Sequence, residues 1–330
     1  MITIGIDLGY GDTKIVGETN KKEKFPSRWS PQDAREWGLG GNIPVLSVNG
    51  GETFTYGDNA IGSHIREPLG DNRLSDPDSL PLLGAALWLS DAGKGGGGNA
   101  EAKNIVLGSG IPLGYFESYV PIATEALEGK TITVKDLSGK TKKFHISKLI
   151  MRPQGVAAAL YLLDQGIIKK QYGYGVIVDI GSRTTEVITL NLKNMEPIVP
   201  MSFTIELGVG DAVSEIGKAI SKETGFIIPS DVALDALSEP VFFKQREVGG
   251  PKVSGPILTS LTSRILDKLR DNLREELDRI SALVPVGGGS ALLGKELEVL
   301  APSTLIPVKP LDAQFANALG YKLIAAGSEE

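Results

Sequence analysis

The chain has 330 residues, of which 41% are hydrophobic and 22% charged, a composition typical of a globular protein that is long enough for two domains. Its 34 basic and 40 acidic side chains give a formal net charge of −6, which argues against a broad basic surface that binds nucleic acid directly. The absence of cysteine excludes disulfides and thiolate metal sites, and the two histidines, His64 and His145, lie in no triad or zinc motif.

Strand and helix patterns alternate along the chain, which predicts an α/β protein. Strands are expected at 2–8, 13–17, 22–26, 43–48, 53–57, 104–108, 130–135, 141–150, 174–179, 184–190, 196–206, 241–248, 282–286 and 304–308. Helices are expected at 79–91, 118–128, 153–170, 210–224, 230–238, 254–281, 289–299 and 312–326. The glycine-rich segment 91–100 predicts a surface loop. No apolar run reaches transmembrane length and the N-terminus opens directly into a strand, so we expect a cytoplasmic protein that binds no membrane.

The first strand ends in a carboxylate that is followed by a glycine-rich turn. Residues 4–14 read IGIDLGYGDTK, in which Asp7 closes the strand pattern and Gly9 follows it. A plain β-hairpin explains this segment equally well, because glycine supplies the positive φ that tight turns need.

A second segment repeats the first. Residues 176–187 read VIVDIGSRTTEV, and aligning Asp179 with Asp7 places Gly181 on Gly9. A turn does not need a preceding aspartate, so the repetition favours two hairpins that face a shared ligand. We therefore expect the two turns to act together.

The chemistry of the two turns narrows the ligand. Backbone N–H groups of glycine-rich turns suit phosphate oxygens. Carboxylates beside a polyphosphate repel it unless a divalent cation lies between them, and Mg²⁺ is typically held by one or two carboxylates together with substrate phosphates. Lys14 adds a positive charge on the phosphate side. These features predict a site for a Mg²⁺–nucleoside triphosphate.

Three further segments carry small residues where such a site would need them. Residues 283–290 read LVPVGGGS, a strand pattern followed by a triple glycine. A plain strand–helix joint needs only one glycine. The motif therefore favours a ligand whose ring or sugar approaches the backbone closely. The segments 151–160 and 314–321 are helical patterns rich in alanine and glycine. Each alone indicates only a tightly packed helix; together they are consistent with two chain crossings between the halves.

In this order the motifs resemble one superfamily. An Asp-Gly hairpin, a helix beginning at Pro-Gln-Gly (153–155), a second Asp-Gly hairpin, a triple glycine and a final small-residue helix are similar to the five-motif order of actins, sugar kinases and heat-shock chaperone ATPases. GSGIPLGYF at 108–116 and GVGDAVSEIGKAI at 208–220 resemble the ParM-type plasmid-segregation actins. FPSRW, LIMRPQG, DIGSRTT and VGGGS resemble the ParM-type actin homologues of Thermoplasma archaea, and the similarity covers the whole chain.

The resemblance implies an actin-like two-domain ATPase fold, built from duplicated ribonuclease-H-like domains with a nucleotide cleft between them. Domain I would comprise 1–152 and 313–330, with an inserted subdomain at about 24–100, and domain II would comprise 153–312, with an insertion at about 207–280. The domains would close on the nucleotide about crossings near 152–154 and 312–315.

The resemblance also implies roles for individual residues. Asp7 and Asp179 would hold Mg²⁺ through water, and Gln154 would orient the attacking water during catalysis. Tyr10 stands where actins often have serine, and Arg183 where many members have glycine or threonine. The residues expected to contact ATP or ADP are Gly9, Tyr10, Gly11, Asp12, Lys14, Gly181, Ser182, Arg183, Thr184, Gly287, Gly288, Gly289 and Ser290.

The function implied is a slow ATPase that converts ATP to ADP and phosphate and forms nucleotide-dependent filaments in plasmid or DNA segregation or in cell organisation. Its partner would be a second copy of itself, and DNA would be reached through an adaptor protein. A sugar-type kinase is one alternative, but such kinases often carry a cysteine zinc motif and lack an aspartate like Asp179. A non-polymerising switch is another; a chaperone would need a peptide-binding domain, and only nine residues follow Tyr321.

The filament contact is expected in the segment 24–100, which is loop-rich and carries all three tryptophans. Trp88 fits the buried face of the helix at 79–91. Trp29 and Trp37 could lie at the contact or pack inside the subdomain.

Overall fold

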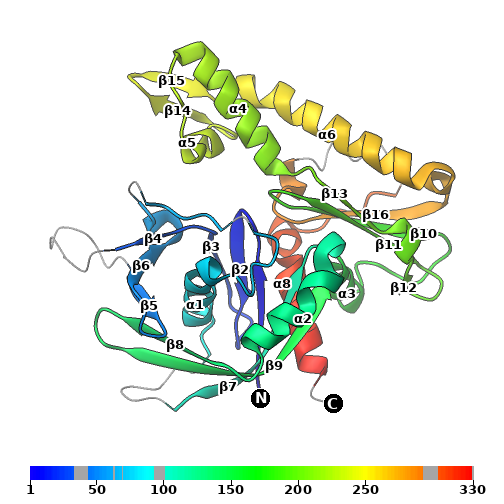
Figure 1. Ribbon diagram of the computed structural model, residues 1–330. Coiled ribbons are helices and arrows are strands. Elements are labelled where there is room, and N and C mark those ends of the chain that lie inside the picture. The colour runs from blue at the N-terminus through cyan, green and yellow to red at the C-terminus, as the bar shows by residue number, and fades with distance from the viewer. Residues whose placement is uncertain (33–43, 62–63, 69, 93–100, 293–303, 329–330) are drawn as a thin grey trace. The chain divides into compact units, whose positions relative to one another are not determined.

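The computed structural model describes residues 1–32, 44–61, 64–68, 70–92, 101–292 and 304–328 (Figure 1). The chain divides into two compact units, Met1–Asp164 with Phe315–Glu330, and Gln165–Gln314. This division keeps the helix α3 (Val156–Asp164) in the first unit, whereas the domain boundary predicted at 152/153 assigns it to domain II.

The first unit is built around a mixed sheet. Its described strands lie in the order β3-β2-β1-β7-β9-β8-β5-β6-β4, with β1 antiparallel to β2 and parallel to β7. Their bounds are β1 (Ile2–Leu8), β2 (Asp12–Val16), β3 (Lys22–Pro26), β4 (Trp29–Pro31), β5 (Leu46–Val48), β6 (Thr53–Tyr56), β7 (Lys103–Ile111), β8 (Thr131–Asp136) and β9 (Thr141–Pro153). The helices are α1 (Leu80–Leu89), α2 (Phe116–Leu127), α3 and, from Phe315 onward, α8 (Pro310–Gly327). Short 3₁₀ turns span Gly57–Asn59, Pro77–Ser79 and Leu113–Tyr115.

The second unit repeats the strand arrangement of the first. The strand β10 (Tyr174–Ile180) pairs antiparallel with β11 (Thr185–Asn191) and parallel with β16 (Ile280–Val286), as β1 does with β2 and β7. All seven residues of β10 are buried, which explains its unbroken apolar pattern. The two hairpins that the sequence repeats, β1–β2 and β10–β11, therefore occupy equivalent positions in the sheets of the two units.

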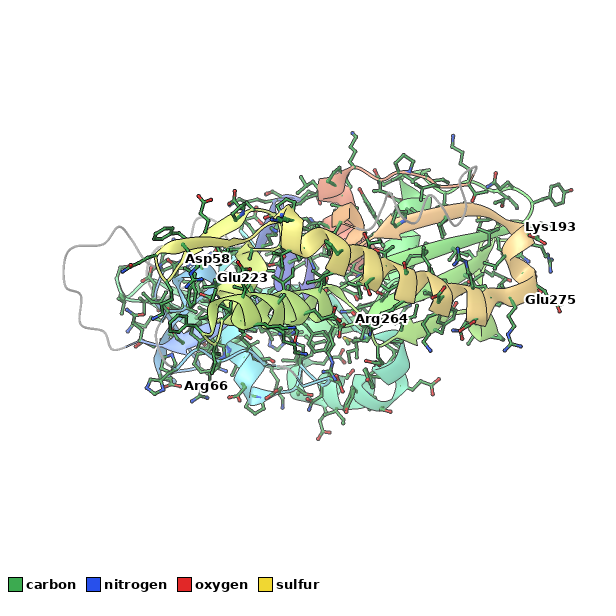
Figure 2. The ribbon with its side chains drawn as sticks, turned by 90° about the horizontal axis from the view of Figure 1, so that it is seen from above. Asp58, Arg66, Lys193, Glu223, Arg264 and Glu275 are labelled. Atoms are coloured by element: carbon green, nitrogen blue, oxygen red, sulfur yellow. The ribbon has the colours of Figure 1, made fainter. Side chains whose placement is uncertain are left out.

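Two long helices cover part of the second unit, α4 (Val209–Thr224) and α6 (Pro251–Leu273) (Figures 1 and 2). Their buried residues recur at helical spacing, and Arg264 on α6 forms an exposed ion pair with Glu215 on α4 at 3.3 Å. The smaller elements are β12 (Glu196–Pro197), the 3₁₀ turn Val199–Met201, β13 (Phe203–Ile205), α5 (Ser230–Asp235), β14 (Pro240–Phe243), β15 (Arg246–Gly249) and the 3₁₀ turn Arg274–Arg279.

Several predicted elements were wrong in kind or extent. The helix expected at 153–170 begins at Val156, because β9 continues to Pro153 in register with β7 and Gly155 then turns at φ +74°. The strand expected at 196–206 is broken by a 3₁₀ turn, and that at 241–248 is a hairpin whose turn residues Lys244 and Gln245 both have positive φ. The helix expected at 254–281 ends at Leu273, and of 304–308 only Leu305 forms a bridge, to Leu283.

The prediction that the small-residue helices pack closely was confirmed. A Cβ added at Gly320 on α8 would overlap the carbonyl oxygen of Ala157 on α3, and one added at Gly5 on β1 would overlap the carbonyl oxygen of Ala318. The glycines thus let α8 lie directly against α3 and β1 within the first unit.

Both described tryptophans, Trp29 and Trp88, pack against the core of the first unit. Trp29 is 3% exposed and donates from Nε1 to the Asp78 carbonyl oxygen at 2.7 Å, so it packs inside the first unit. Trp88 is partly buried against the same core, with the Lys142 Nζ 4.8 Å from its ring centroid. The predictions for Trp37, for the glycine run at 95–98 and for the helix beyond residue 292 fall outside the described residues. No described helix is long and apolar enough to cross a bilayer.

Candidate functional site

The first hairpin brings three of the predicted site residues together. Asp7 is the next-to-last residue of β1 and lies opposite Lys14 of β2, so both side chains emerge on one face of the sheet. Lys14 Nζ lies 3.4 Å from Asp7 Oδ2, and Gln154 Nε2 donates to Asp7 Oδ1 at 3.3 Å. Asp7 is 4% exposed and Lys14 is 8% exposed, so the pair is buried.

The turn itself is braced from outside by a serine that the motif did not single out. Ser27 donates from Oγ to the Gly9 carbonyl oxygen at 2.6 Å and from its backbone N–H to the Gly11 carbonyl oxygen at 2.8 Å. Its hydroxyl also lies 2.9 Å from Thr13 Oγ1. The FPSRW segment contains this serine, but only the fold shows that it fixes the turn. Asp12 forms an ion pair with Lys24 at 3.5 Å.

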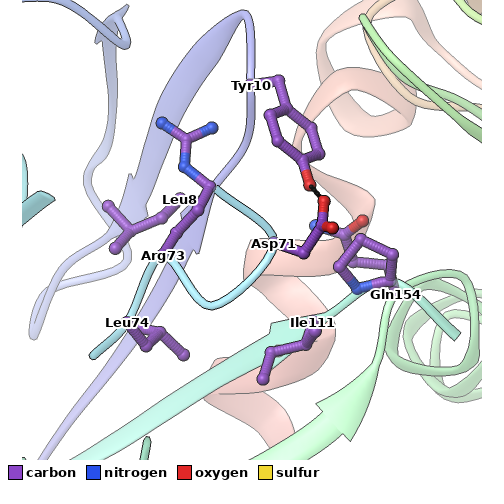
Figure 3. A pocket seen from close by; sticks show the side chains of 9 residues that line it. Leu8, Tyr10, Asp71, Arg73, Leu74, Ile111 and Gln154 are labelled. Carbon is purple, nitrogen blue, oxygen red and sulfur yellow. Dashed lines mark hydrogen bonds between the residues drawn. The ribbon is translucent and has the colours of Figure 1, made fainter. Parts of the chain in front are cut away.

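A small pocket lies beside this turn (Figure 3). Tyr10 donates from its hydroxyl to Asp71 Oδ1 at 2.6 Å, and the Arg73 guanidinium carbon lies 4.9 Å from the Tyr10 ring centroid. Gln154 also lines the pocket. Asp71 and Arg73 were not predicted, because they come from a segment without periodicity or a recognisable motif.

The second hairpin has the same turn geometry. Asp179 is 5% exposed and is again the next-to-last residue of its strand. The Gly181 N–H donates to the Thr184 carbonyl oxygen at 2.9 Å, and a Cβ at Gly181 would lie 2.9 Å from that oxygen, as one at Gly9 would lie 2.7 Å from the Asp12 oxygen. Both glycines are therefore required by the turns that contain them.

The residue opposite the aspartate differs between the hairpins. Asp179 faces Glu186 across the strand pair, in the position that Lys14 holds in the first hairpin. Glu186 is 1% exposed and its Oε2 accepts a hydrogen bond from Thr204 Oγ1 at 2.6 Å. The second hairpin thus presents two carboxylates on one face, where the first presents a carboxylate and an ammonium group.

The start of α4 is bonded to the second turn. The N–H groups of Val209 and Gly210 donate to the carbonyl oxygens of Gly181 and Ser182 at 3.1 and 2.7 Å. A Cβ at Gly208 would overlap the Ser182 carbonyl oxygen. The small residues of the segment GVG (208–210) therefore allow the start of the helix to lie directly against the second turn.

The triple glycine packs against the same turn, which gives two of its glycines a structural reason. The joint was expected to need one glycine, but Gly287 has φ +84° with its Cβ position 2.5 Å from Asp179 Oδ1, and a Cβ at Gly289 would lie 2.5 Å from Ile180 Cγ2. Gly289 also donates to the Ile180 carbonyl oxygen at 2.9 Å. Of the three, Gly288 alone is exposed. The buried Ser290 donates to the Gly287 carbonyl oxygen at 2.8 Å.

The predicted site residues therefore form two groups, each within its own unit. One comprises Asp7, the turn 9–12, Lys14 and Gln154; the other comprises Asp179, the turn 181–184 and the segment 287–290. Carboxylate oxygens suit Mg²⁺, which uses few protein ligands and keeps several waters. The described residues contain no group of three or more acidic, histidine or cysteine side chains that could hold a metal ion.

Two family models match the chain. Residues 5–156 match the N-terminal domain of actin-like proteins, and residues 177–299 match the C-terminal region of the MreB-like archaeal actin homologue. An archaeal actin homologue from Thermoplasma acidophilum is 54% identical over 323 residues, which cover 98% of each chain, and one from Thermoplasma volcanium is 53% identical over the same share.

Solved structures show the same relation. The crystal structure of the archaeal actin homologue Ta0583 in complex with ADP has a TM-score of 0.87 and 52% identity, covering 99% of this chain and all of that one. A ParM protein from Clostridium botulinum, solved as a 15-stranded filament, has a TM-score of 0.85 at 22% identity and covers 98% of this chain and 99% of that one. The latter likeness establishes the actin-like fold.

Proposed function

Because the chain belongs to the archaeal actin homologue family, we propose that it is a Mg²⁺-dependent ATPase that assembles into filaments in a nucleotide-dependent manner. The repeated Asp-Gly hairpin, with a buried aspartate at the same place in both units, is the observation that carries the proposal. The ADP complex of the relative at 52% identity and the filament formed by the more distant ParM protein support it.

The chain's own residues would divide the work between them. Asp7 and Asp179 would hold the hydrated metal, and the turns 9–12 and 181–184 would bind the phosphates. The Lys14 ammonium group pairs with Asp7 in the structure, and it would turn to contact a phosphate oxygen when nucleotide binds. Bound Mg²⁺ supplies positive charge that offsets the charge developing on the phosphates during transfer.

Gln154 would position the attacking water. Its amide already contacts Asp7, so it lies at the carboxylate next to which the phosphates would bind. An amide orients water but accepts a proton poorly, which predicts slow hydrolysis of the kind that times a switch or a filament. Filaments of such a protein would serve DNA segregation or cell organisation through an adaptor, since the chain carries a net negative charge.

Calorimetric titration with ADP, in Mg²⁺ and in EDTA, tests the binding step. We expect Asp7→Asn and Asp179→Asn to weaken the Mg²⁺-dependent affinity by roughly tenfold or more, because each removes a charged oxygen ligand. Asp58→Asn is the matched control, since the Asp58 side chain is 84% exposed and pairs only at the surface with Arg28. Unchanged affinity in both hairpin variants would refute the proposed site.

A further inference from the structure

Arg73 is a buried cation beside the first hairpin. Its side chain is 5% exposed, and Nε, Nη1 and Nη2 find no hydrogen-bond acceptor within the described part of the chain. A guanidinium group carries five N–H donors, and leaving such donors unsatisfied in the interior is costly. The position therefore lowers the stability of the folded chain unless an acceptor arrives from elsewhere.

The Arg73 side chain remains charged at neutral pH. Burial lowers its pKa to about 10, while the charges of Tyr10, Asp7 and Asp76 act in the opposite direction. The ring of Tyr10 provides a cation–π contact, but this contact satisfies none of the N–H donors. A fork of charged donors is thus retained next to the turn proposed to bind phosphates.

Tyr10 covers this fork. Its hydroxyl bond to Asp71 fixes the ring beside the guanidinium group (Figure 3). Leu8, Ile111 and Gln154 contribute to the same pocket, which has room for about one water molecule. A phosphate group is larger than a water molecule, so the pocket must widen before a phosphate reaches Arg73, and Tyr10 is the lining side chain in contact with both Asp71 and Arg73.

We propose that Arg73 binds a phosphate oxyanion at the first hairpin, and that Tyr10 is the side chain that moves off Asp71 to admit it. The planar fork of arginine matches two oxygens of a tetrahedral oxyanion, which gives short, charge-assisted hydrogen bonds. The inference rests on the proposed function, because the nucleotide brings the oxyanion to this turn. Its source is either the terminal phosphate of the bound nucleotide or the inorganic phosphate that hydrolysis releases.

Titration calorimetry with three ligands separates these sources. The ligands are Mg-ADP, Mg-ADP with inorganic phosphate, and the Mg²⁺ complex of a non-hydrolysable ATP analogue. For Arg73→Met we expect Mg-ADP affinity within about twofold of wild type, and a loss of about tenfold in whichever arm carries the recognised phosphate, because charge-assisted bonds disappear. Arg66→Met is the matched control: Arg66 also lies 4.9 Å from an aromatic centroid, that of Trp29, but it is exposed and pairs with Asp78 at 3.1 Å.

Unfolding of the unliganded variants distinguishes a binding role from a structural one. Replacing an uncompensated buried cation with an apolar side chain is often neutral or stabilising, so Arg73→Met should unfold at the wild-type temperature or above it. Wild-type affinity in all three arms would overturn the proposal whatever the unfolding temperature, and a lower unfolding temperature beside it would assign Arg73 a structural role. If Arg73→Met does not fold, Arg73→Lys decides in its place, because it keeps the charge but lacks the fork and should lose affinity in the same arm.

Tyr10→Phe tests the cover. The variant keeps the ring but loses the hydroxyl that bonds to Asp71. The affinity for the ligand that Arg73 recognises should therefore rise about two- to fivefold, because the ring no longer has to break this hydrogen bond before it moves. Weaker binding in that arm would contradict the assigned role of Tyr10. If the wild-type protein bound no Mg-ADP, the proposed function would fail. Thermal unfolding of wild type and of Arg73→Met with increasing inorganic phosphate would then still decide whether Arg73 binds the oxyanion.

Discussion

The two hairpin aspartates occupy matching positions but meet different neighbours. Asp7 is contacted by the Lys14 ammonium group at 3.4 Å, whereas Asp179 lies opposite the carboxylate of Glu186. A neighbouring cation offsets the charge of Asp7, while two acidic groups on one face favour a cation next to Asp179. The repeat in sequence therefore does not make the two turns electrostatically equal, and we expect Asp179→Asn to weaken Mg²⁺ binding more than Asp7→Asn does.

Gln154 provides the prediction at the residue scale that separates chemistry from binding. For Gln154→Ala we expect nucleotide affinity within about twofold of wild type and turnover lower by roughly a hundredfold, because the amide positions water rather than phosphate. Parallel measurements of affinity by calorimetry and of phosphate release in the steady state test this. Gln171→Ala is the control, since Gln171 is exposed, its side chain donates to the Ser281 carbonyl oxygen at 3.4 Å, and the substitution keeps its backbone N–H bond to Leu192. Equal losses of affinity and turnover would move Gln154 into a structural role.

Among the elements, α8 depends most on its small side chains. It lies against α3 at Gly320, against β1 at Ala318 and against β7 at Tyr321, whose carbonyl oxygen blocks any Cβ at Gly108. Lys322 on the same helix donates from Nζ to the Glu18 carbonyl oxygen at 2.9 Å and to Asn20 Oδ1 at 2.7 Å. Residues 318–322 of the helix are thus fixed by close backbone contacts and by the hydrogen bonds of Lys322.

Two glycines of α8 give a matched stability test. Gly320→Ala should lower the free energy of unfolding by about 2 kcal/mol or more, because the added methyl group must displace the backbone of α3. Gly327→Ala, near the exposed end of the same helix, meets nothing within 4 Å and should change stability by less than about 1 kcal/mol. Chemical denaturation of both variants measures the difference, and similar losses in the two would refute the close packing at Gly320.

The elements also show what the sequence could predict. Asp7 and Asp179 could be placed at strand ends because an apolar strand pattern followed by Asp-x-Gly is a local signal, and the helical spacing of α4 is equally local. Pro153 was misplaced because its position depends on pairing with Ile111 of β7, which is distant in sequence. Arg73 and Ser27 were missed for the same reason: only the fold brings these side chains to the turn.

At the scale of the whole molecule, the chain passes between its units twice, after Asp164 and again before Phe315. Assembly must use surface that each unit leaves exposed. Trp29 is excluded as a contact because it packs inside the first unit, and in the described part of 24–100 the exposed large hydrophobic residues are Ile61 and Ile65. Within the described residues of this segment, a filament contact would therefore draw its apolar surface from these two residues, whereas Trp37 lies outside the described residues.

Sedimentation of the purified wild-type protein across a concentration series, in Mg-ATP, Mg-ADP and EDTA, tests the proposed function most directly. The account predicts that protein pellets in Mg-ATP above a critical concentration, and that much less pellets in Mg-ADP or in EDTA, because filament assembly follows the nucleotide state. Protein that stays in the supernatant as monomer or dimer under all three conditions, at every concentration, would contradict it and would leave a non-polymerising nucleotide switch as the better account.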